Sequence, residues 1–316
     1  MSCWHRAPRV NPTPAPAGRG TCPNAMTELV LQALWSGILT GSSYALIALG
    51  LALVFGTMNV INLAHGELVL LAAYVAYTCE SAWGASPLLA IPAAIVIVCI
   101  ATALTYGLVG RIRRDRELNS LLLTYGIGIM LTNGILLIWK ADIRSTKSAW
   151  LQDAIVFGPL YSMRSELLFF AVSAALIAGL WWWLTRTWAG RAVRAVASNR
   201  DAAQLMGIDP HRVEFVSFLV AGLLAAFAGA AIFSVGVIQP GLGISLTIKA
   251  FIITVLAGMG SVPGLLVGAL LLGLTESLTT TFFSSALQEL AGMVLFLVVL
   301  FVLPNGLFGT RWRRAH

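Results

Sequence analysis

Charged residues are scarce in this sequence. Asp, Glu, Lys and Arg together make up 10% of the 316 residues, whereas hydrophobic residues make up 58%. Soluble domains are typically about 25% charged, so the composition excludes a soluble globular protein and predicts a polytopic membrane protein. The four cysteines, Cys3, Cys22, Cys79 and Cys99, show neither metal-ligand spacing nor a disulfide framework. We therefore expect no bound metal.

Several catalytic motifs are also missing. The sequence has no G-x-x-x-x-G-K-S/T run, which excludes an ATP-binding loop of that kind, and no H-E-x-x-H or G-x-S-x-G run. An intramembrane enzyme is therefore poorly supported, and we expect no cofactor. The net charge of +7 comes from arginines in loops that flank apolar segments. This placement favours contact with membrane lipid and argues against nucleic acid as a partner.

Residues 1–25 differ from the rest of the chain. They are rich in proline, alanine and arginine and contain no apolar core of a signal peptide. We expect either a disordered N-terminal extension or a mis-assigned start, with Met26 as the functional initiator.

Apolar segments dominate the remainder, and most are long enough to cross a membrane, which takes about 20 helical residues. They lie at roughly 29–56, 63–83, 87–109, 120–139, 166–185, 213–238, 246–281 and 286–303. The predicted fold class is an all-α polytopic membrane protein with about eight apolar transmembrane segments. One of them, 246–281, is broken or re-entrant, because the run GMGSVPG (258–264) does not suit a continuous helix.

Arginine placement predicts the orientation. The loops 110–119 and 186–212 and the basic tail 311–316 are arginine-rich and should be cytoplasmic. Segment 140–165 then lies outside. Segment 246–281 must return to the side where it began, as a pair of short crossings or a re-entrant hairpin with the glycine-proline break at its apex. Broken helices at membrane depth line cavities, so Gly258, Gly260 and Gly264 are candidates for a translocation path.

Few ionisable residues lie in apolar context, and each is a functional candidate. The run NVINLAHGE (59–67) allows two interpretations. In the first, Asn62 and His65 cap a helix and Glu67 lies near its positive N-terminal end. In the second, these side chains face a conduit. Lys249 either snorkels to the interface or neutralises a carboxylate across the bundle. Glu276 and Glu289 are expected at the interface.

The loop 186–212 is the longest polar interval between apolar segments and has its own helix signals. Ser198 precedes Asp201 by three residues, as in a capping box, and predicts a short helix through Met206. Gly207 suits a left-handed stop, and Asp209-Pro210 restarts a helix. Leu205, Met206 and Ile208 cluster beside charges. The loop is either a helix that docks in a partner's groove or an amphipathic helix that lies on anionic lipid.

Four runs, in order along the chain, resemble the permeases of branched-chain amino acid ABC importers. They are GSSYALIALGLALVFGTMNVINLAHGE (41–67), GRAVRAVASNRDAAQLMGIDPHRV (190–213), KAFIITVLAGMGSVPGLLVGALLLGLTES (249–277) and LPNGLFG (303–309). The resemblance covers nearly everything from Met26 onward. It implies a transmembrane permease domain over 26–310 that pairs with a second, related permease in the bacterial inner membrane.

The resemblance also implies two cytoplasmic ATP-binding subunits, which hydrolyse the ATP, and an extracytoplasmic solute-binding protein. The run 190–213 would carry the coupling helix that contacts the ATPases. The implied coupling residues are Arg194, Arg200, Asp201, Leu205, Met206, Gly207 and Ile208. Permeases of urea and short-chain amide importers are similar, so they are an alternative. A secondary transporter working alone is less favoured, because the acidic residues sit mostly at segment ends.

The start-site hypothesis is testable. A chain that begins at Met26 should insert and transport like the full-length chain, because residues 1–25 have no apolar surface to bury. Membrane-fraction yield and uptake would be measured for both forms. Loss of either on truncation would contradict the hypothesis.

Overall fold

The computed structural model describes residues 23–84, 86–112, 115–258, 261–303 and 306–308. Gly260, most of the N-terminal extension (1–22) and the tail 311–316 lie outside the described residues. The first helix begins at Pro23, three residues before Met26.

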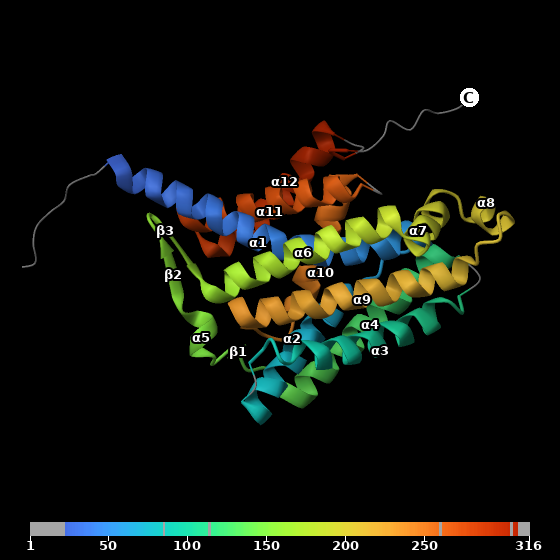
Figure 1. The fold of residues 1–316 in the computed structure, drawn as a ribbon, viewed down its shortest axis with the longest axis horizontal. Coiled ribbons are helices and arrows are strands. Elements are labelled where there is room, and N and C mark those ends of the chain that lie inside the picture. The colour runs from blue at the N-terminus through green and yellow to red at the C-terminus, as the bar shows by residue number, and fades with distance from the viewer. Residues whose placement is uncertain (1–22, 85, 113–114, 259–260, 304–305, 309–316) are drawn as a thin grey trace, which may run out of the picture.

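Long helices form the body of the molecule and run side by side along its long axis (Figure 1). The helices are α1 (Pro23–Met58), α2 (His65–Trp83), α3 (Ile91–Val109), α4 (Arg116–Trp139), α5 (Ala149–Gln152), α6 (Arg164–Arg186), α7 (Trp188–Ser198), α8 (Arg200–Leu205), α9 (Pro210–Val235), α10 (Leu242–Ala257), α11 (Val262–Phe282), the 3-10 turn η1 (Ser285–Leu287) and α12 (Gln288–Val302). Seven helical segments of the described chain are long and apolar enough to cross a membrane, and α10 is a shorter apolar helix. The predicted all-α polytopic class is confirmed.

Four short strands gather at one end of the bundle, called the strand end here. They are β1 (Arg144–Ser145), β2 (Ala154–Phe157), β3 (Leu160–Met163) and β4 (Val237–Ile238). β1 pairs antiparallel with β4, and β2 with β3. The side chain of Gln32 on α1 donates to the Tyr161 carbonyl at 2.8 Å, so α1 begins at this end.

Helices α7 and α8 lie at the opposite end (Figure 1). Arg116, which begins α4, and Arg200, which begins α8, bind the same carboxylate, that of Glu214. The arginine-rich loops 110–119 and 186–212 therefore share one end of the bundle. By the positive-inside tendency we expect this end to be cytoplasmic and the strand end to be extracytoplasmic, and the two ends are named accordingly.

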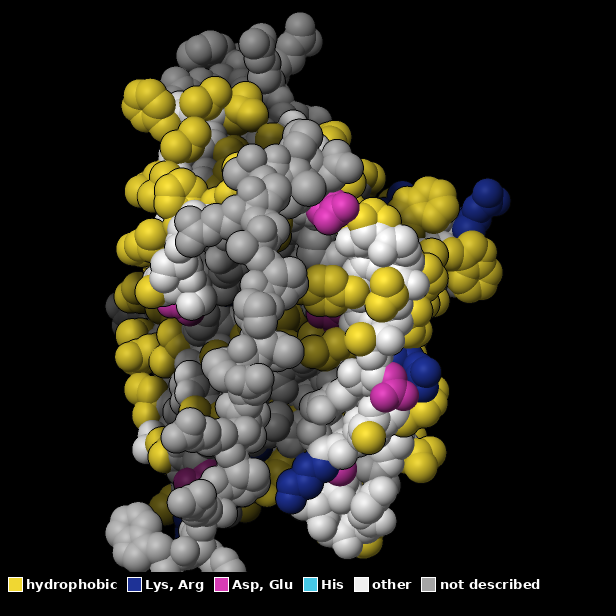
Figure 2. All heavy atoms as spheres, turned by 90° about the vertical axis from the view of Figure 1, so that its left-hand side faces the viewer, with side chains coloured by type: hydrophobic (Ala, Val, Ile, Leu, Met, Phe, Trp, Pro, Cys, Tyr) yellow, Lys and Arg dark blue, Asp and Glu magenta, His cyan; other side chains and the backbone are white. Residues whose placement is uncertain are grey.

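The core lies between α1, α2, α9 and α10, and the apolar faces of α3, α4 and α12 are left outside. Leu137 on α4 is 84% exposed and Phe301 on α12 is 91% exposed. Figure 2, which looks onto the strand end, shows hydrophobic side chains along both flanks and only isolated charged ones. Such lateral surfaces suit hydrocarbon or another membrane subunit.

The broken segment resolves into α10 and α11, with the break between them near the cytoplasmic end. Leu307 and Phe308 donate backbone hydrogen bonds to the carbonyls of Leu256 and Ala257, which fixes this junction. α11 then returns to the strand end. The segment thus returns to the side where it began, as expected, but only α11 is long enough to span a membrane, because α10 begins at Leu242 inside the bundle. Its start lies at the depth of Glu67.

Small residues permit the closest helix contacts, as expected where packing rather than hydrophobic burial drives association. A Cβ added at Gly229 on α9 would collide with the Val69 carbonyl and the Ala72 side chain on α2. Gly107 on α3, by contrast, has no atom within 4 Å of such a Cβ.

Gly229→Ala should therefore lower the unfolding temperature of the purified protein, because the α2 and α9 backbones must separate and overpacking costs about 1–3 kcal/mol. Gly107→Ala is the matched control and should leave it unchanged or raise it slightly. Equal unfolding temperatures for the two variants would contradict the close contact.

Candidate translocation and coupling sites

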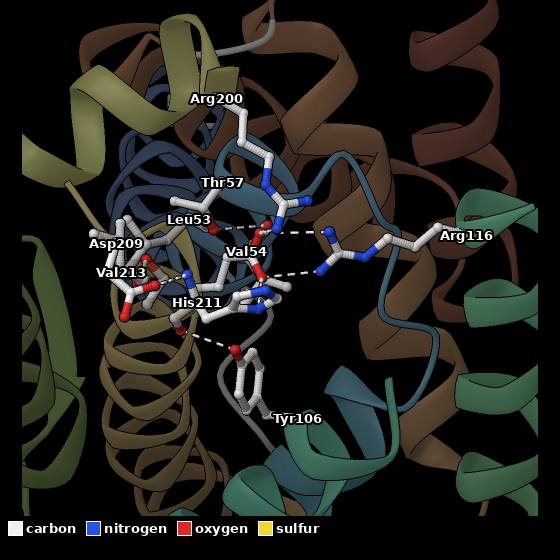
Figure 3. Close-up of polar contacts among 11 residues, drawn as sticks. Leu53, Val54, Thr57, Tyr106, Arg116, Arg200, Asp209, His211 and Val213 are labelled. Atoms are coloured by element: carbon white, nitrogen blue, oxygen red, sulfur yellow. Dashed lines mark hydrogen bonds and ion pairs between the residues drawn. The ribbon is translucent and has the colours of Figure 1, made fainter. Parts of the chain in front are cut away.

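Three helices meet at the cytoplasmic end around the carboxylate of Glu214, in the second turn of α9. This side chain is fully buried. Arg116 approaches it at 2.9 Å and Arg200 at 3.0 Å, and the His211 imidazole lies 3.8 Å away. Figure 3 shows the two guanidinium groups converging from α4 and α8, with Tyr106 donating to the His211 carbonyl beneath them. A buried carboxylate shared by two arginines ties α4, α8 and α9 together.

Helix α8 is short and defined by caps at both ends. The Asn199 side chain accepts from the Ala202 N–H at 2.9 Å, so Asn199 begins the helix and the predicted role of Ser198 is wrong. Asn199 takes the extended conformation of an N-cap, whereas Ser198 is still the last residue of α7. Gly207 has φ +82° and ends it, as predicted. Asp209 caps α9 by accepting from the His211 N–H, with Pro210 as the first residue.

The loop presents two apolar side chains to solvent. Leu205 is 89% exposed and Met206 is 82% exposed. Ile208 instead packs against the core, and Arg200 is engaged by Glu214. Arg194 and Asp201 are exposed. These two adjacent large hydrophobic side chains on a capped and anchored helix form an exposed apolar projection, called the α8 knob here, with no partner among the described residues.

Helices α2 and α10 both begin inside the bundle. The His65 imidazole lies 3.0 Å from the Ile47 carbonyl, well before the end of α1, and the Gly66 N–H donates to the Thr247 hydroxyl at 2.9 Å. Asn62 accepts from the Ala64 N–H, so it shapes the approach to α2 without capping it. His65 likewise serves as no side-chain cap.

Glu67 lies in the first turn of α2 and is 1% exposed. Its carboxylate faces Gly243 in the first turn of α10, where a Cβ would collide with it, and Thr132 of α4 lies nearby. Within the described residues neither carboxylate oxygen accepts a well-formed hydrogen bond. The N-terminal turns of two helices, α2 and α10, thus meet at this acid.

Lys249 pairs with a carboxylate across the bundle. Its ammonium lies 2.8 Å from Glu276 Oε2 and 2.9 Å from the Tyr44 hydroxyl. Tyr44 and Gln288 also donate to the same Glu276 oxygen, at 2.8 and 2.6 Å. The expectation that Glu276 is interfacial is wrong, because the side chain is 2% exposed and satisfies its charge inside the protein. Glu289 is exposed and lines the rim of a cavity, and its expected place at the membrane interface stays a prediction.

A cavity of about 690 Å³ extends from the strand end to this ion pair. Glu166 and Val237 lie on its wall near the strands, and Tyr44 and Lys249 lie on its inner wall. Phe169 and Leu246 add apolar surface. The cavity, called the vestibule here, therefore extends from the strand end to Lys249, the partner of the buried Glu276.

The candidate glycines lie elsewhere. Gly258 has φ +78° and packs against Gly306, while a Cβ at Gly264 would crowd the Ala257 carbonyl and the Phe308 ring. Both positions hold the α10–α11 junction at the cytoplasmic end. The structure thus separates the candidate path residues into three groups, around Glu67, around Lys249 and around the junction.

Comparison with known proteins decides the family. The sequence matches the family described as branched-chain amino acid transport system / permease component over residues 33–303. The chain belongs to this family. The high-affinity branched-chain amino acid transport system permease protein BraD of Pseudomonas aeruginosa is 32% identical, covering 88% of this chain and 95% of its own length. LivH of Escherichia coli strain K12, described in the same words, is 30% identical over the same shares.

A more distant likeness concerns the fold alone. A chain of PsaBC from Streptococcus pneumoniae, solved in complex with a Fab, superposes with a TM-score of 0.54 at 16% identity, covering 89% of this chain and 97% of that one. Family membership and the apolar helices make this protein a multi-pass bacterial membrane permease that works within an ABC transporter complex. Subunits of this kind are not themselves ATPases.

Sequence reasoning missed Glu214, Tyr44 and Gln288. Glu214 did give a signal, because it is an acid just inside the apolar segment 213–238. Tyr44 and Gln288 gave none, because a tyrosine within an apolar segment and a glutamine near a segment end are both common, and their partner Glu276 lies more than ten residues away.

The Glu214 cluster yields a prediction. Glu214→Gln removes the charge between two arginines and should destabilise α8. A cost of about 2 kcal/mol is expected, below the 3–5 kcal/mol of a fully buried pair, because both guanidinium groups keep solvent contact. Backbone hydrogen exchange over 199–207 should accelerate accordingly.

Arg212→Gln is the control, since it breaks only the exposed pair with Asp209, in which the side chains are 88% and 49% exposed. Exchange in this variant should match the wild type. If Glu214→Gln also leaves the exchange of 199–207 unchanged, the cluster does not anchor α8.

Proposed function

We propose that this chain is the membrane-spanning permease subunit of an ATP-driven importer for branched-chain amino acids. In this proposal it pairs with a second, related permease, two cytoplasmic ATP-binding subunits and an extracytoplasmic solute-binding protein. The main support is the family match over 33–303 together with relatives named for branched-chain amino acid transport. The apolar knob on α8 is the structural feature that links this chain to its ATPases.

The α8 knob favours a protein partner over lipid. A helix lying on a membrane would spread its apolar residues along one face and hold basic residues beside them. Here Leu205 and Met206 project together at the tip, and the nearby Arg200 is turned inward to Glu214. Buried apolar anchors of this kind supply most of the free energy at protein contacts.

The proposed mechanism divides the work between the two ends. The binding protein delivers the amino acid to the strand end, where the 690 Å³ cavity opens. Closure of the ATPases on ATP displaces α8, and α8 moves α9 and α4 through Glu214. This motion switches the cavity between outward and inward access, and the permease makes or breaks no covalent bond.

Proteoliposomes that contain the complete importer test the function directly. Leucine, isoleucine and valine should accumulate only when two conditions are met. ATP must be on the side of the membrane that α8 faces, and the binding protein must be on the side that the strand end faces. Absence of ATP-dependent accumulation, or a preference for urea or short amides over branched-chain amino acids, would overturn the proposal.

The coupling role predicts the behaviour of a charged variant. Leu205→Asp with Met206→Asp should release the ATPases, because truncating such anchors costs about 2 kcal/mol or more, roughly 30-fold in affinity. Insertion and pairing with the sister permease should be retained. Co-purification of the ATPases and the coupling of ATP hydrolysis to uptake would be measured.

The matched control is Ala202→Asp with Gln204→Asp, which adds the same charge at exposed positions of the same helix. This variant should keep its ATPases. Wild-type co-purification and uptake in the Leu205/Met206 variant would mean that the loop is a lipid-facing spacer.

A further inference from the structure

A second, smaller cavity of about 350 Å³ lies between α10, α11 and α12. Its polar lining includes Lys249, Glu276 and Glu289, and its apolar lining includes Ile252, Leu272 and Met293. The size lies within the range of small-molecule pockets, about 300–1,000 Å³. The cavity therefore has a charged part and an apolar part.

This cavity adjoins the vestibule at the strand end. Leu242, Ser245, Lys249 and Glu289 line both. The Ser245 hydroxyl donates to Glu289 at 2.6 Å, so one hydrogen bond between α10 and α12 lies where the two spaces meet. The two cavities therefore share a wall that includes this hydrogen bond.

Lys249 keeps one donor available. An ammonium group has three N–H donors. Within the described residues two of them are used, by Glu276 Oε2 and by the Tyr44 oxygen. The third can bind an incoming anionic oxygen without breaking the existing pair.

Glu276 keeps one acceptor available. Its Oε2 atom accepts from Tyr44, Lys249 and Gln288, whereas its buried Oε1 atom has no hydrogen-bond partner within the described residues. An orphaned oxygen of a buried carboxylate costs free energy unless something binds it. An ammonium donor from a ligand would satisfy it.

Gly292 of α12 keeps the space beside that oxygen open. A Cβ at this position would lie 3.5 Å from Glu276 Oε1 and 3.0 Å from Leu272 Cδ1. Any larger residue would therefore fill the junction between the orphaned oxygen and the apolar wall.

We propose that this cavity is a subsite for a zwitterionic α-amino acid with a branched apolar side chain. The Lys249 ammonium binds the ligand carboxylate, Glu276 Oε1 accepts from the ligand ammonium, and Ile252, Leu272 and Met293 contact the side chain. The inference rests on the proposed import function and adds the residues that recognise the solute within the membrane.

The charges favour a zwitterion over a singly charged ligand. A carboxylic acid without an amine would leave Glu276 Oε1 unpaired and would face Glu289 as well. An amine without a carboxylate would leave the third Lys249 donor unpaired. A ligand that carries both groups on one carbon atom, as an α-amino acid does, satisfies both.

Thiol protection in the complete importer tests the subsite. Met293→Cys places a thiol on the apolar wall, and Val294→Cys, one position along α12 and absent from the cavity lining, is the control. Leucine should slow maleimide labelling of Met293→Cys severalfold and leave Val294→Cys unaffected. 4-Methylpentanoate and isoamylamine, which are leucine without its amine and leucine without its carboxylate, should protect much less.

Two further changes in the Met293→Cys background separate recognition from folding. Glu276→Gln keeps the side-chain shape but removes the charge, and should raise the leucine concentration for half-protection at least about tenfold, or 1.4 kcal/mol. Gly292→Val leaves every charge in place and should abolish protection by filling the cavity. Both variants are scored only after assembly with the sister permease and ATPases is verified.

The outcomes distinguish this inference from the proposed function. Leucine accumulation without any protection of Met293→Cys, or equal protection by all three compounds, would overturn the subsite and leave the importer function standing. Protection retained in both Glu276→Gln and Gly292→Val would also overturn it. Protection without ATP-driven accumulation would support the subsite and overturn the import function.

Discussion

The start of α2 and the start of α10 meet inside the bundle, and the surrounding fold depends on enclosing them. Helix starts leave backbone N–H groups unpaired, which is costly where no water is available. Here the Gly66 N–H finds the Thr247 hydroxyl, and the Glu67 carboxylate faces the first turn of α10 across Gly243. These contacts require close approach of α2 to α10 and a wall of α1, α4 and α9 around them. The buried positions of α2 and α9 and the exposed faces of α3, α4 and α12 follow from this requirement.

The ionised groups obey the same constraint. A charge removed from water must be paired or hydrogen-bonded. Glu214 is shared by two arginines at the cytoplasmic end, and Glu276 is held by Lys249, Tyr44 and Gln288 between α1, α10, α11 and α12. Each cluster joins helices that are distant in sequence. The two carboxylates differ in their hydrogen-bond partners. Glu276 keeps one oxygen without a partner beside a cavity, whereas Glu214 is surrounded by donors and connects three helices.

Sequence reasoning reached the class of fold, because long apolar runs and arginine-rich loops are local properties that a bilayer constrains strongly. It also reached the Gly207 stop and the Asp209-Pro210 restart, since both depend on backbone preferences of single residues. It did not reach the Asn199 cap, because two neighbouring capping residues differ only in which one takes the extended conformation. Nor could it place Glu276, whose burial depends on a lysine 27 residues away and on tertiary packing. The sequence therefore identified the candidate path residues one at a time, and only the structure showed which of them lie together.

Helix α9 connects the two ends of the proposed mechanism. Near its first residue Glu214 binds Arg200 of α8, and near its last residues Ile232 and Val235 line the vestibule. An uninterrupted helix of 26 residues is about 39 Å long and transmits displacement along its axis with little bending. A push on α8 through Leu205 and Met206 must therefore move either the Glu214 cluster or α9 itself. Because two arginines hold Glu214, moving α9 as a rigid body costs less free energy than breaking these ion pairs. Such a movement displaces the part of the vestibule wall that α9 forms. The proposed mechanism also gives a reason for the closeness of the apolar knob to the Glu214 cluster: in it, the knob contacts the ATPase, and the cluster passes the movement of α8 to α9, the helix that lines the vestibule.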